Sequence, residues 1–139
     1  MIVLDTDVVS EVMRPAPSPE VLRWWAGYPA SSLFTTTVTQ AEILYGIALM
    51  AKGRRRQALE SAAKAVFAED FAERVLPFDS DAAEVFAQIA SSSRARGRPM
   101  TQLDAQIAAI AHSRGAALAT RNTADFEHCG VRLLNPWKA

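Results

Sequence analysis

The sequence predicts an α/β fold of three layers, with helices on both faces of a central, mostly parallel sheet of about five short strands. Short apolar or β-rich runs alternate with longer segments in which apolar residues recur every three or four positions. This alternation is typical of parallel sheets that are covered on both faces. Because the chain has 139 residues and half of them are hydrophobic, we expect one domain, residues 1–139, around a single core.

The chain up to residue 72 predicts two strands and four helices. Each strand is a short run of apolar or β-branched residues, and each helix carries apolar residues at helical spacing. Pro15 ends the first helix, Ser18 caps the second with Pro19 in its first turn, and residues 52–56 separate the third from the fourth. In chain order we expect a strand at 2–4, helices at 8–14 and 19–27, a strand at 33–37, and helices at 38–50 and 57–72.

The remainder of the chain predicts a short strand, two helices and two further strands. Gly97 and Pro99 close the first of these helices, and Gly115 stops the second. A turn-rich piece, residues 121–130, separates the last two strands. We expect these elements at 75–78, 81–96, 102–114, 116–120 and 131–134.

Composition limits the classes of function. Lysine plus arginine equals aspartate plus glutamate at 15 each, so any contact with a polyanion must come from a local patch. The lone Cys129 excludes a disulfide framework and a multi-cysteine zinc site, and it is better explained as a small, partly buried hydrophobe. Because no apolar run approaches about 20 residues and no basic segment precedes the first apolar run, we expect neither a membrane span nor a signal peptide. We therefore expect a cytoplasmic protein.

Several polar residues follow predicted strands, at the edge where parallel sheets carry their sites. Asp5 closes the first strand, and Asn122 and Asp125 come just after the strand at 116–120. Taken singly, each fits an ordinary turn or a helix cap, and Asp7 fits a cap even better because it can begin the helix at Val8.

Two further carboxylates, Glu42 and Asp104, stand in sequences that also spell a helix capping box, TQAE and TQLD. Their apolar neighbours favour a partly buried position instead. Val38, Tyr45 and Leu49 share the side of Glu42. Ala108 and Ala111 share the face of Asp104, and the adjoining core is expected to hold Leu103, Ile107 and Ile110. A carboxylate in such surroundings needs a cation or a hydrogen-bond donor.

If these carboxylates converge, their repulsion has to be compensated. Two unit charges about 4 Å apart repel by roughly 4 kcal/mol at an effective dielectric constant near 20. Arg121 is the only basic residue within these motifs. A hard divalent cation with oxygen ligands is therefore the expected compensation.

Five segments, in this order and spacing, carry a resemblance to a known family: IVLDTDVVSE at 2–11, TQAEILYG at 39–46, LDAQIAA at 103–109, ATRNTADF at 119–126 and NPW at 135–137. Together they resemble PIN-domain proteins, specifically the VapC and FitB-like toxins of bacterial toxin–antitoxin pairs. The likeness covers essentially the whole chain and implies a PIN-like α/β/α fold.

The resemblance implies a Mg²⁺- or Mn²⁺-dependent endoribonuclease, commonly a homodimer, that is neutralised by a cognate antitoxin which also binds operator DNA. Asp5, Glu42 and Asp104 match the acidic metal-site positions of the family. At the fourth position, where some members have an acid, this chain has Asn122, with Asp125 three residues later. The expected reaction is metal-assisted hydrolysis, with Asp5 and Asp104 as metal ligands and Glu42 orienting water or helping to hold a second ion; Asn122 and Asp125 complete the expected catalytic set.

Other residues are candidates for contacts with RNA or protein. Tryptophans at 24, 25 and 137 could stack on bases but fit a core or an interface better. The helical hairpin at 38–72 is a plausible dimer or antitoxin surface. The candidate phosphate contacts are Arg14, residues 52–56, Arg94, Arg96 and Arg98, of which 52–56 fit a solvated loop better.

Two other functions fit part of the sequence. The segment DTDVV also matches the opening motif of haloacid-dehalogenase-like phosphatases, in which Asp5 would be a nucleophile and Asp7 an acid or base, but the downstream lysine and paired acids of that class are missing. A non-catalytic PIN scaffold acting in DNA-bound toxin–antitoxin regulation is the second alternative. Metal-free RNA cleavage typically needs a pair of histidines, and the chain has only His112 and His128, of which His112 fits a structural or surface role.

Overall fold

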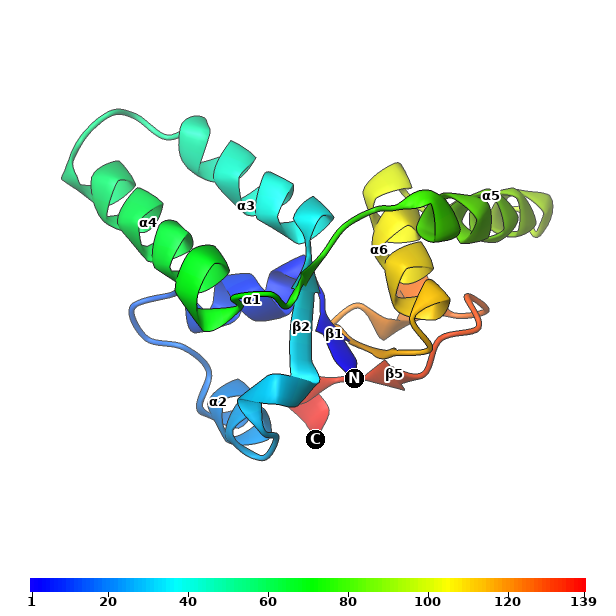
Figure 1. Ribbon diagram of the computed structural model, residues 1–139, viewed down its shortest axis with the longest axis horizontal. Coiled ribbons are helices and arrows are strands. Elements are labelled where there is room, and N and C mark those ends of the chain that lie inside the picture. Colours follow the sequence, from blue (N-terminus) through cyan, green and yellow to red (C-terminus); the bar gives the residue numbers. More distant parts are fainter.

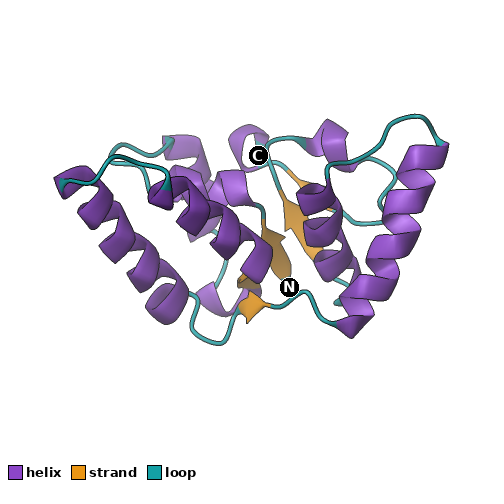
Figure 2. Cartoon of the chain, turned by 90° about the horizontal axis from the view of Figure 1, so that it is seen from above, coloured by secondary structure: helices purple, strands orange, loops and turns teal.

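The computed structural model describes residues 1–139 and contains one five-stranded sheet with helices on either side of it (Figures 1 and 2). All four strand pairs are parallel, and the strand order is β3-β2-β1-β4-β5. The strands are β1 (Ile2–Leu4), β2 (Leu33–Thr36), β3 (Val75–Leu76), β4 (Ala117–Ala119) and β5 (Leu133–Leu134). The predicted fold class is confirmed, and the sheet is parallel throughout.

Six α-helices lie within a few residues of their predicted positions: α1 (Thr6–Val12), α2 (Pro19–Ala26), α3 (Thr37–Ala48), α4 (Arg54–Ala65), α5 (Ser80–Ala95) and α6 (Gln102–Ser113). Four short helical segments join them: η1 (Ala30–Ser32), η2 (Val66–Asp70), η3 (Thr123–Phe126) and η4 (Pro136–Lys138). The helix expected at 57–72 is really two elements, α4 and the single wide π-helical turn η2.

The sheet separates two clusters of buried side chains, as alternate residues of a strand covered on both faces require. On β1, Val3 packs into the cluster that includes α5 and α6, whereas Ile2 and Leu4 pack into the cluster that includes α1, α2 and α4. The strands therefore lie between two helical layers, which Figure 2 shows from above. Cys129 is buried and unpaired in the first cluster, as expected.

The strand order reverses direction at β1, because β2 lies on one side of it and β4 on the other. Parallel sheets bind ligands beyond the carboxyl ends of their strands at such a point. In Figure 1, α3 rises from this edge of the sheet, and α6 also reaches it with its N-terminal end. No helix is long and apolar enough to cross a membrane.

Candidate active site

Asp5 lies at the centre of this edge, directly after β1, and is only 5% exposed. One carboxylate oxygen accepts a hydrogen bond from the backbone N–H of Thr6 at 2.8 Å. The other accepts one from the hydroxyl of Thr120, at the end of β4, also at 2.8 Å. Two donors from neighbouring strand ends therefore fix the orientation of this carboxylate.

Electrostatics make Asp5 the most perturbed acid of the site. Burial first, and then the charges of Asp7 and Asp104, raise its pKa to about 7, and the hydrogen bonds from Thr120 and Thr6 only partly oppose this rise. The effect of Asp104 shows that α6 brings this residue within electrostatic range of Asp5, although the two are 99 residues apart in the chain.

Glu42 is half-buried on α3 and is held by a side chain from α1. The hydroxyl of Thr6 donates to its carboxylate at 2.8 Å, and Thr39 lies 3.0 Å from the same hydroxyl. The capping-box interpretation of Glu42 is wrong, because α3 begins at Thr37 and its cap is Thr36, which accepts from the N–H of Thr39.

The expected apolar surroundings of Glu42 and Asp104 are corrected in part. Tyr45 and Leu49 are 67% and 69% exposed, and Leu103 is 45% exposed. The hydroxyl of Thr6, rather than an apolar stripe, therefore accounts for the position of Glu42. On α6, the helix of Asp104, Ile107 and Ile110 are buried in the core as predicted.

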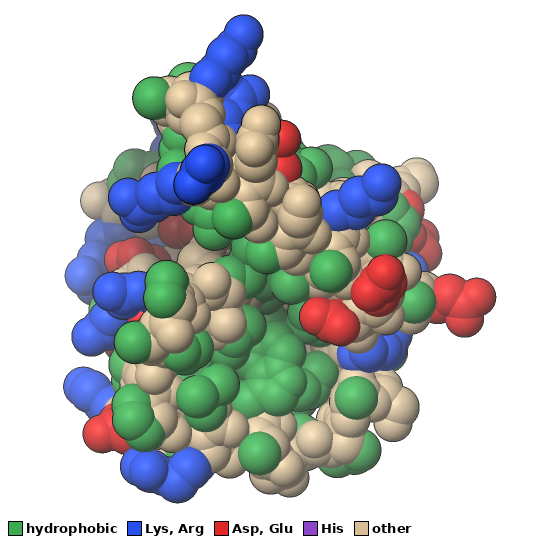
Figure 3. Space-filling model, turned by 90° about the vertical axis from the view of Figure 1, so that its left-hand side faces the viewer, with side chains coloured by type: hydrophobic (Ala, Val, Ile, Leu, Met, Phe, Trp, Pro, Cys, Tyr) green, Lys and Arg blue, Asp and Glu red, His purple; other side chains and the backbone are tan.

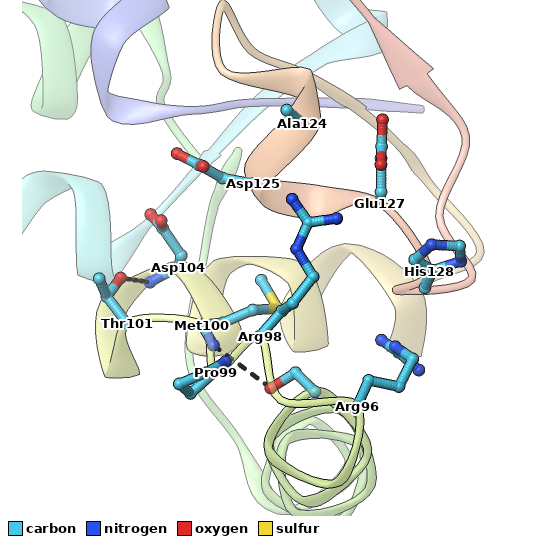
Figure 4. Close-up of a pocket in the computed structure, with 11 residues that line it drawn as sticks. Arg96, Arg98, Pro99, Met100, Thr101, Asp104, Ala124, Asp125, Glu127 and His128 are labelled. Carbon is cyan, nitrogen blue, oxygen red and sulfur yellow. Dashed lines mark hydrogen bonds between the residues drawn. The ribbon is translucent and has the colours of Figure 1, made fainter.

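Asp104 lies in the first turn of α6, where its N–H donates to the capping hydroxyl of Thr101 at 3.2 Å. Burial raises its pKa, the Thr101 hydrogen bond lowers it, and the nearby charge of Asp125 raises it. In Figure 4, the carboxylates of Asp104 and Asp125 point toward the same side of the pocket that they line. The negative charge of Asp125 therefore makes Asp104 harder to ionise.

Asn122 and Asp125 belong to the loop and short helix η3 that follow β4, and both are exposed. The N–H of Asn122 donates to the Thr120 hydroxyl at 3.1 Å, and its side-chain amide lies 3.5 Å from a carboxylate oxygen of Asp7. The structure thus brings both residues to the edge that carries Asp5, with Asn122 near Asp7 and Asp125 near Asp104.

Asp7 is a site residue that the sequence interpretation missed. It does not cap α1, because that helix begins at Thr6 with Asp5 as its cap. Its Oδ2 accepts from the N–H of Arg121 at 3.0 Å, while its Oδ1 is buried with no hydrogen-bond partner. The signal was the Asp-Thr-Asp sequence directly after a buried strand, which places two carboxylates at one strand end.

A family model described as "PIN domain" matches residues 2–130. The chain belongs to the PIN-domain family. Similar proteins include the plasmid stability protein StbB of Pseudomonas syringae pv. tomato, 41% identical over all of both chains. The VapC ribonuclease Y4jK of Sinorhizobium fredii is 36% identical, and the toxin FitB of Neisseria gonorrhoeae is 35% identical, each over 99% of both chains. The resemblance to VapC and FitB toxins is thus confirmed.

Solved structures of PIN-domain complexes share the fold of this chain. A structure of FitAB bound to a DNA fragment matches with a TM-score of 0.91 and 35% identity, over 99% of this chain and 96% of that one. A crystal structure of FitAcB from Neisseria gonorrhoeae matches with a TM-score of 0.88 and 32% identity over the whole of both chains. The phosphatase alternative is therefore withdrawn, and none of the three lysines lines the pocket that contains Asp104 and Asp125.

One pocket of this PIN domain combines acidic and basic side chains. It has a volume of about 320 Å³ and lies between the α5–α6 turn and η3 (Figure 4). Asp104 and Asp125 line one part of it, and Arg96 and Arg98 line another. The Arg98 side chain extends between Asp125 and Glu127, whereas Arg96 extends toward His128. An anion that contacts the arginines would therefore lie next to the carboxylates.

The other basic candidates lie outside this pocket, and two of them, Arg14 and Arg55, line a separate pocket that also contains Glu42. Arg14 pairs with Glu11 at 3.4 Å, Arg56 pairs with Glu60 at 2.8 Å, and the rest of the 52–56 segment is exposed. Arg94 does not line the acidic pocket. Trp24 is buried against Tyr28, as the core interpretation expects.

The acidic residues suit a divalent cation that keeps part of its water shell. None of the three ion pairs includes Asp5, Asp7, Glu42, Asp104 or Asp125. No three acidic, histidine or cysteine side chains form a ready-made cage. Mg²⁺ usually binds through one or two carboxylates and retains several waters, so a cage is not required. The unpartnered oxygen of Asp7 is the observation that favours such a cation.

Proposed function

We propose that this protein is a Mg²⁺- or Mn²⁺-dependent endoribonuclease and the toxin of a toxin–antitoxin pair. The observation that carries the proposal is the arrangement of carboxylates from β1, α3 and α6 at one edge of the sheet without basic partners. The reaction is inferred from relatives with the names VapC ribonuclease and, at 29% identity, tRNA(fMet)-specific endonuclease VapC of Shigella flexneri.

In this proposal Asp5 and Asp104 hold the ion, and Glu42 binds water or contributes to a second metal position. Such an ion would act as a Lewis acid toward the phosphate and lower the pKa of water. The Thr120 hydroxyl keeps Asp5 in one orientation, and the Thr6 hydroxyl does the same for Glu42. Glu42, once oriented, can accept a proton from the attacking water.

The pocket arginines are the proposed phosphate contacts. Arg96 and Arg98 line the same pocket as Asp104 and Asp125, so a phosphate bound by them lies beside the acidic residues. Guanidinium groups bind phosphate oxygens through paired hydrogen bonds. Asp125 and Asn122 are proposed to act at this boundary between the basic and acidic parts of the site.

A cognate antitoxin and a second copy of the chain are the proposed protein partners, and the antitoxin would also bind operator DNA. The FitAB and FitAcB structures support a complex of this kind, and one of them contains DNA. Exposed apolar side chains at the C-terminal end of α3 and on its cap residue support a protein contact there: Leu44, Tyr45 and Leu49. A cytoplasmic location follows from the proposed RNA substrate.

The first test of the proposal is Asp5→Asn. We expect purified wild-type chain to cleave RNA with Mg²⁺ or Mn²⁺ and not with EDTA, and the variant to lose at least a hundredfold in rate because a metal ligand is neutralised. Asp81→Asn, an exposed acid on α5, is the matched control and should cleave normally. Gel analysis of a labelled RNA measures the rates.

Two outcomes would contradict the proposal. Unchanged cleavage by Asp5→Asn would mean that Asp5 has been misassigned. A wild-type chain that binds a co-expressed antitoxin and DNA but cleaves no RNA with any divalent ion would support the non-catalytic scaffold instead.

A further inference from the structure

The fourth acidic position of the site has no acid in this chain. The PIN-domain resemblance leads to the expectation of an acid there in some members, but position 122 of this chain is an asparagine. Its side-chain amide lies 3.5 Å from Oδ2 of Asp7. A carboxylate is therefore present at this place in the fold, but it comes from α1 instead of the loop after β4.

Asp7 is held in a way that leaves one oxygen free. Oδ2 accepts from the N–H of Arg121 at 3.0 Å and lies 3.5 Å from the Thr120 hydroxyl. Oδ1 is buried and has no hydrogen-bond partner, because the N–H of Val8, which is near enough to lower the pKa of Asp7, donates to the carbonyl of Asp5 at 3.1 Å. The Arg121 guanidinium lies over the Trp137 ring, 5.0 Å from its centroid, and forms no ion pair with Asp7, although its charge lowers the pKa of Asp7.

The carboxylate of Asp7 lies close enough to Asp5 for its charge to affect the ionisation of Asp5. Asp5 and Asp7 both approach the Thr120 hydroxyl, which is 2.8 Å from Oδ2 of Asp5 and 3.5 Å from Oδ2 of Asp7. The charge of Asp7 is also the largest contribution from another residue's charge to the raised pKa of Asp5. A buried carboxylate oxygen without a donor is costly unless a cation is nearby.

We propose that Asp7 is a further metal-binding residue of this site and takes the place of the acid that position 122 lacks. Oδ2 anchors the side chain to the backbone after β4, and Oδ1 contacts the ion directly or through one of its waters. Asn122 then acts as the neutral neighbour that holds Asp7 in place. This inference rests on the proposed function, because it assumes a divalent ion at Asp5.

Asp125 is the competing source of the fourth acid. It is exposed, has no contact with Asp7 or Asn122 through its carboxylate, and affects Asp104 instead of Asp5. Asp125→Asn therefore tests this competing residue, and Asp81→Asn, which removes an exposed acid of α5, is the control outside the site.

The test measures Mn²⁺ affinity of the full chain by calorimetry or by the electron paramagnetic resonance of free Mn²⁺. We expect Asp7→Asn to weaken Mn²⁺ binding at least tenfold, Asp125→Asn to weaken it less than threefold, and the control Asp81→Asn to leave it unchanged. The exchange variant, Asp7→Asn with Asn122→Asp, should return to within about threefold of wild type. Asn122→Asp alone should bind Mn²⁺ more tightly, and it tests the inference even if Asp7→Asn folds poorly.

Thermal unfolding provides a readout that a purely structural role would not give. In EDTA at pH 8, Asp7→Asn should melt at a higher temperature than wild type because a buried unpaired charge has been removed. Saturating Mn²⁺ should raise the melting temperature of Asp7→Asn by less than it raises that of wild type. A structural hydrogen-bond acceptor would instead lower the melting temperature under both conditions.

Three results would overturn the inference: unchanged Mn²⁺ affinity in Asp7→Asn, equal losses in Asp7→Asn and Asp125→Asn with no recovery on exchange, or no effect of Asn122→Asp. If wild type binds Mn²⁺ and Asp5→Asn does not, these results reject the role of Asp7 alone. If wild type binds no Mn²⁺ at all, the proposed function fails together with this inference.

Discussion

At the scale of single residues, the site depends on one carboxylate that folding makes hard to ionise. The pKa of Asp5 rises from 3.8 to about 7, mainly through burial and then through the charge of Asp7. Between these pH values the folded state holds a proton that the unfolded state has lost. Without metal, the contribution of Asp5 to stability is therefore largest at acidic pH and falls as the pH rises toward 7.

This raised pKa predicts a pH dependence of stability that Asp5→Asn removes. A rise from 3.8 to about 7 corresponds to roughly 4 kcal/mol between its two limits. In EDTA, wild type should lose stability relative to Asp5→Asn from about pH 4 to pH 7, as measured by urea unfolding. Saturating Mg²⁺ at pH 8 should restore much of the difference in wild type only. Parallel pH profiles of the two proteins in EDTA would show that Asp5 ionises normally.

At the scale of elements, the turn between α5 and α6 positions the pocket arginines. Ser93 is 3% exposed; its hydroxyl donates to the carbonyl of Ala90 at 3.0 Å and accepts from the N–H of Met100 at 3.3 Å. The hydroxyl thus ties the last turns of α5 to the residue just before the cap of α6. Arg96 and Arg98 lie within the segment that this contact closes.

Ser93→Ala should loosen this turn without touching the carboxylates. Leaving the Met100 N–H without its partner should cost about 1–2 kcal/mol of stability. RNA affinity, measured with Ca²⁺ to prevent turnover, should fall a few-fold, while Mn²⁺ affinity stays unchanged. The control is Ser91→Ala, an exposed serine that bonds only to the carbonyl of Gln88. If Ser93→Ala and Ser91→Ala bind RNA with the same affinity, the turn does not contribute to RNA binding.

The elements themselves were largely predictable from the sequence. Ser18 caps α2 with Pro19 in its first turn, and all five strands formed where short apolar runs were found. The π-helical turn η2 was not predictable, because its residues have the same apolar spacing as the end of an ordinary helix. Helix starts were the weakest point: Thr36 and Thr39 are both plausible caps, and only the structure identifies Thr36.

The site was predictable as a set of residues but not as a set of contacts. Asp5, Glu42 and Asp104 were expected from their positions and the family resemblance. The hydroxyl of Thr6 that holds Glu42, and the contact of Asp7 with the loop after β4, join residues 36 and 114 positions apart. Local sequence carries no information on such pairings, so Asp7 was assigned to the nearest helix instead.

At the scale of the whole molecule, attraction to RNA has to be local, because the formal net charge is zero. Each phosphate contact adds about −0.7 to the slope of log K against log salt for single strands. Replacing both Arg96 and Arg98 by alanine should therefore make this slope shallower by about 1.4, as measured by filter binding with Ca²⁺. Arg94→Ala, outside the pocket, should leave it unchanged. A double variant with the wild-type slope would place the phosphates elsewhere.

The hydrogen bond between Asp5 and Thr120 spans 115 residues, nearly the full length of the chain. Contacts of such long sequence separation can form only after the intervening segments have been made and brought together. A polypeptide still emerging from a ribosome has β1 but not β4, so its first carboxylate is neither shielded nor oriented. If the chain is the proposed nuclease, its acidic site is therefore incomplete until β4 has been translated, which leaves an interval for an inhibitor to be made.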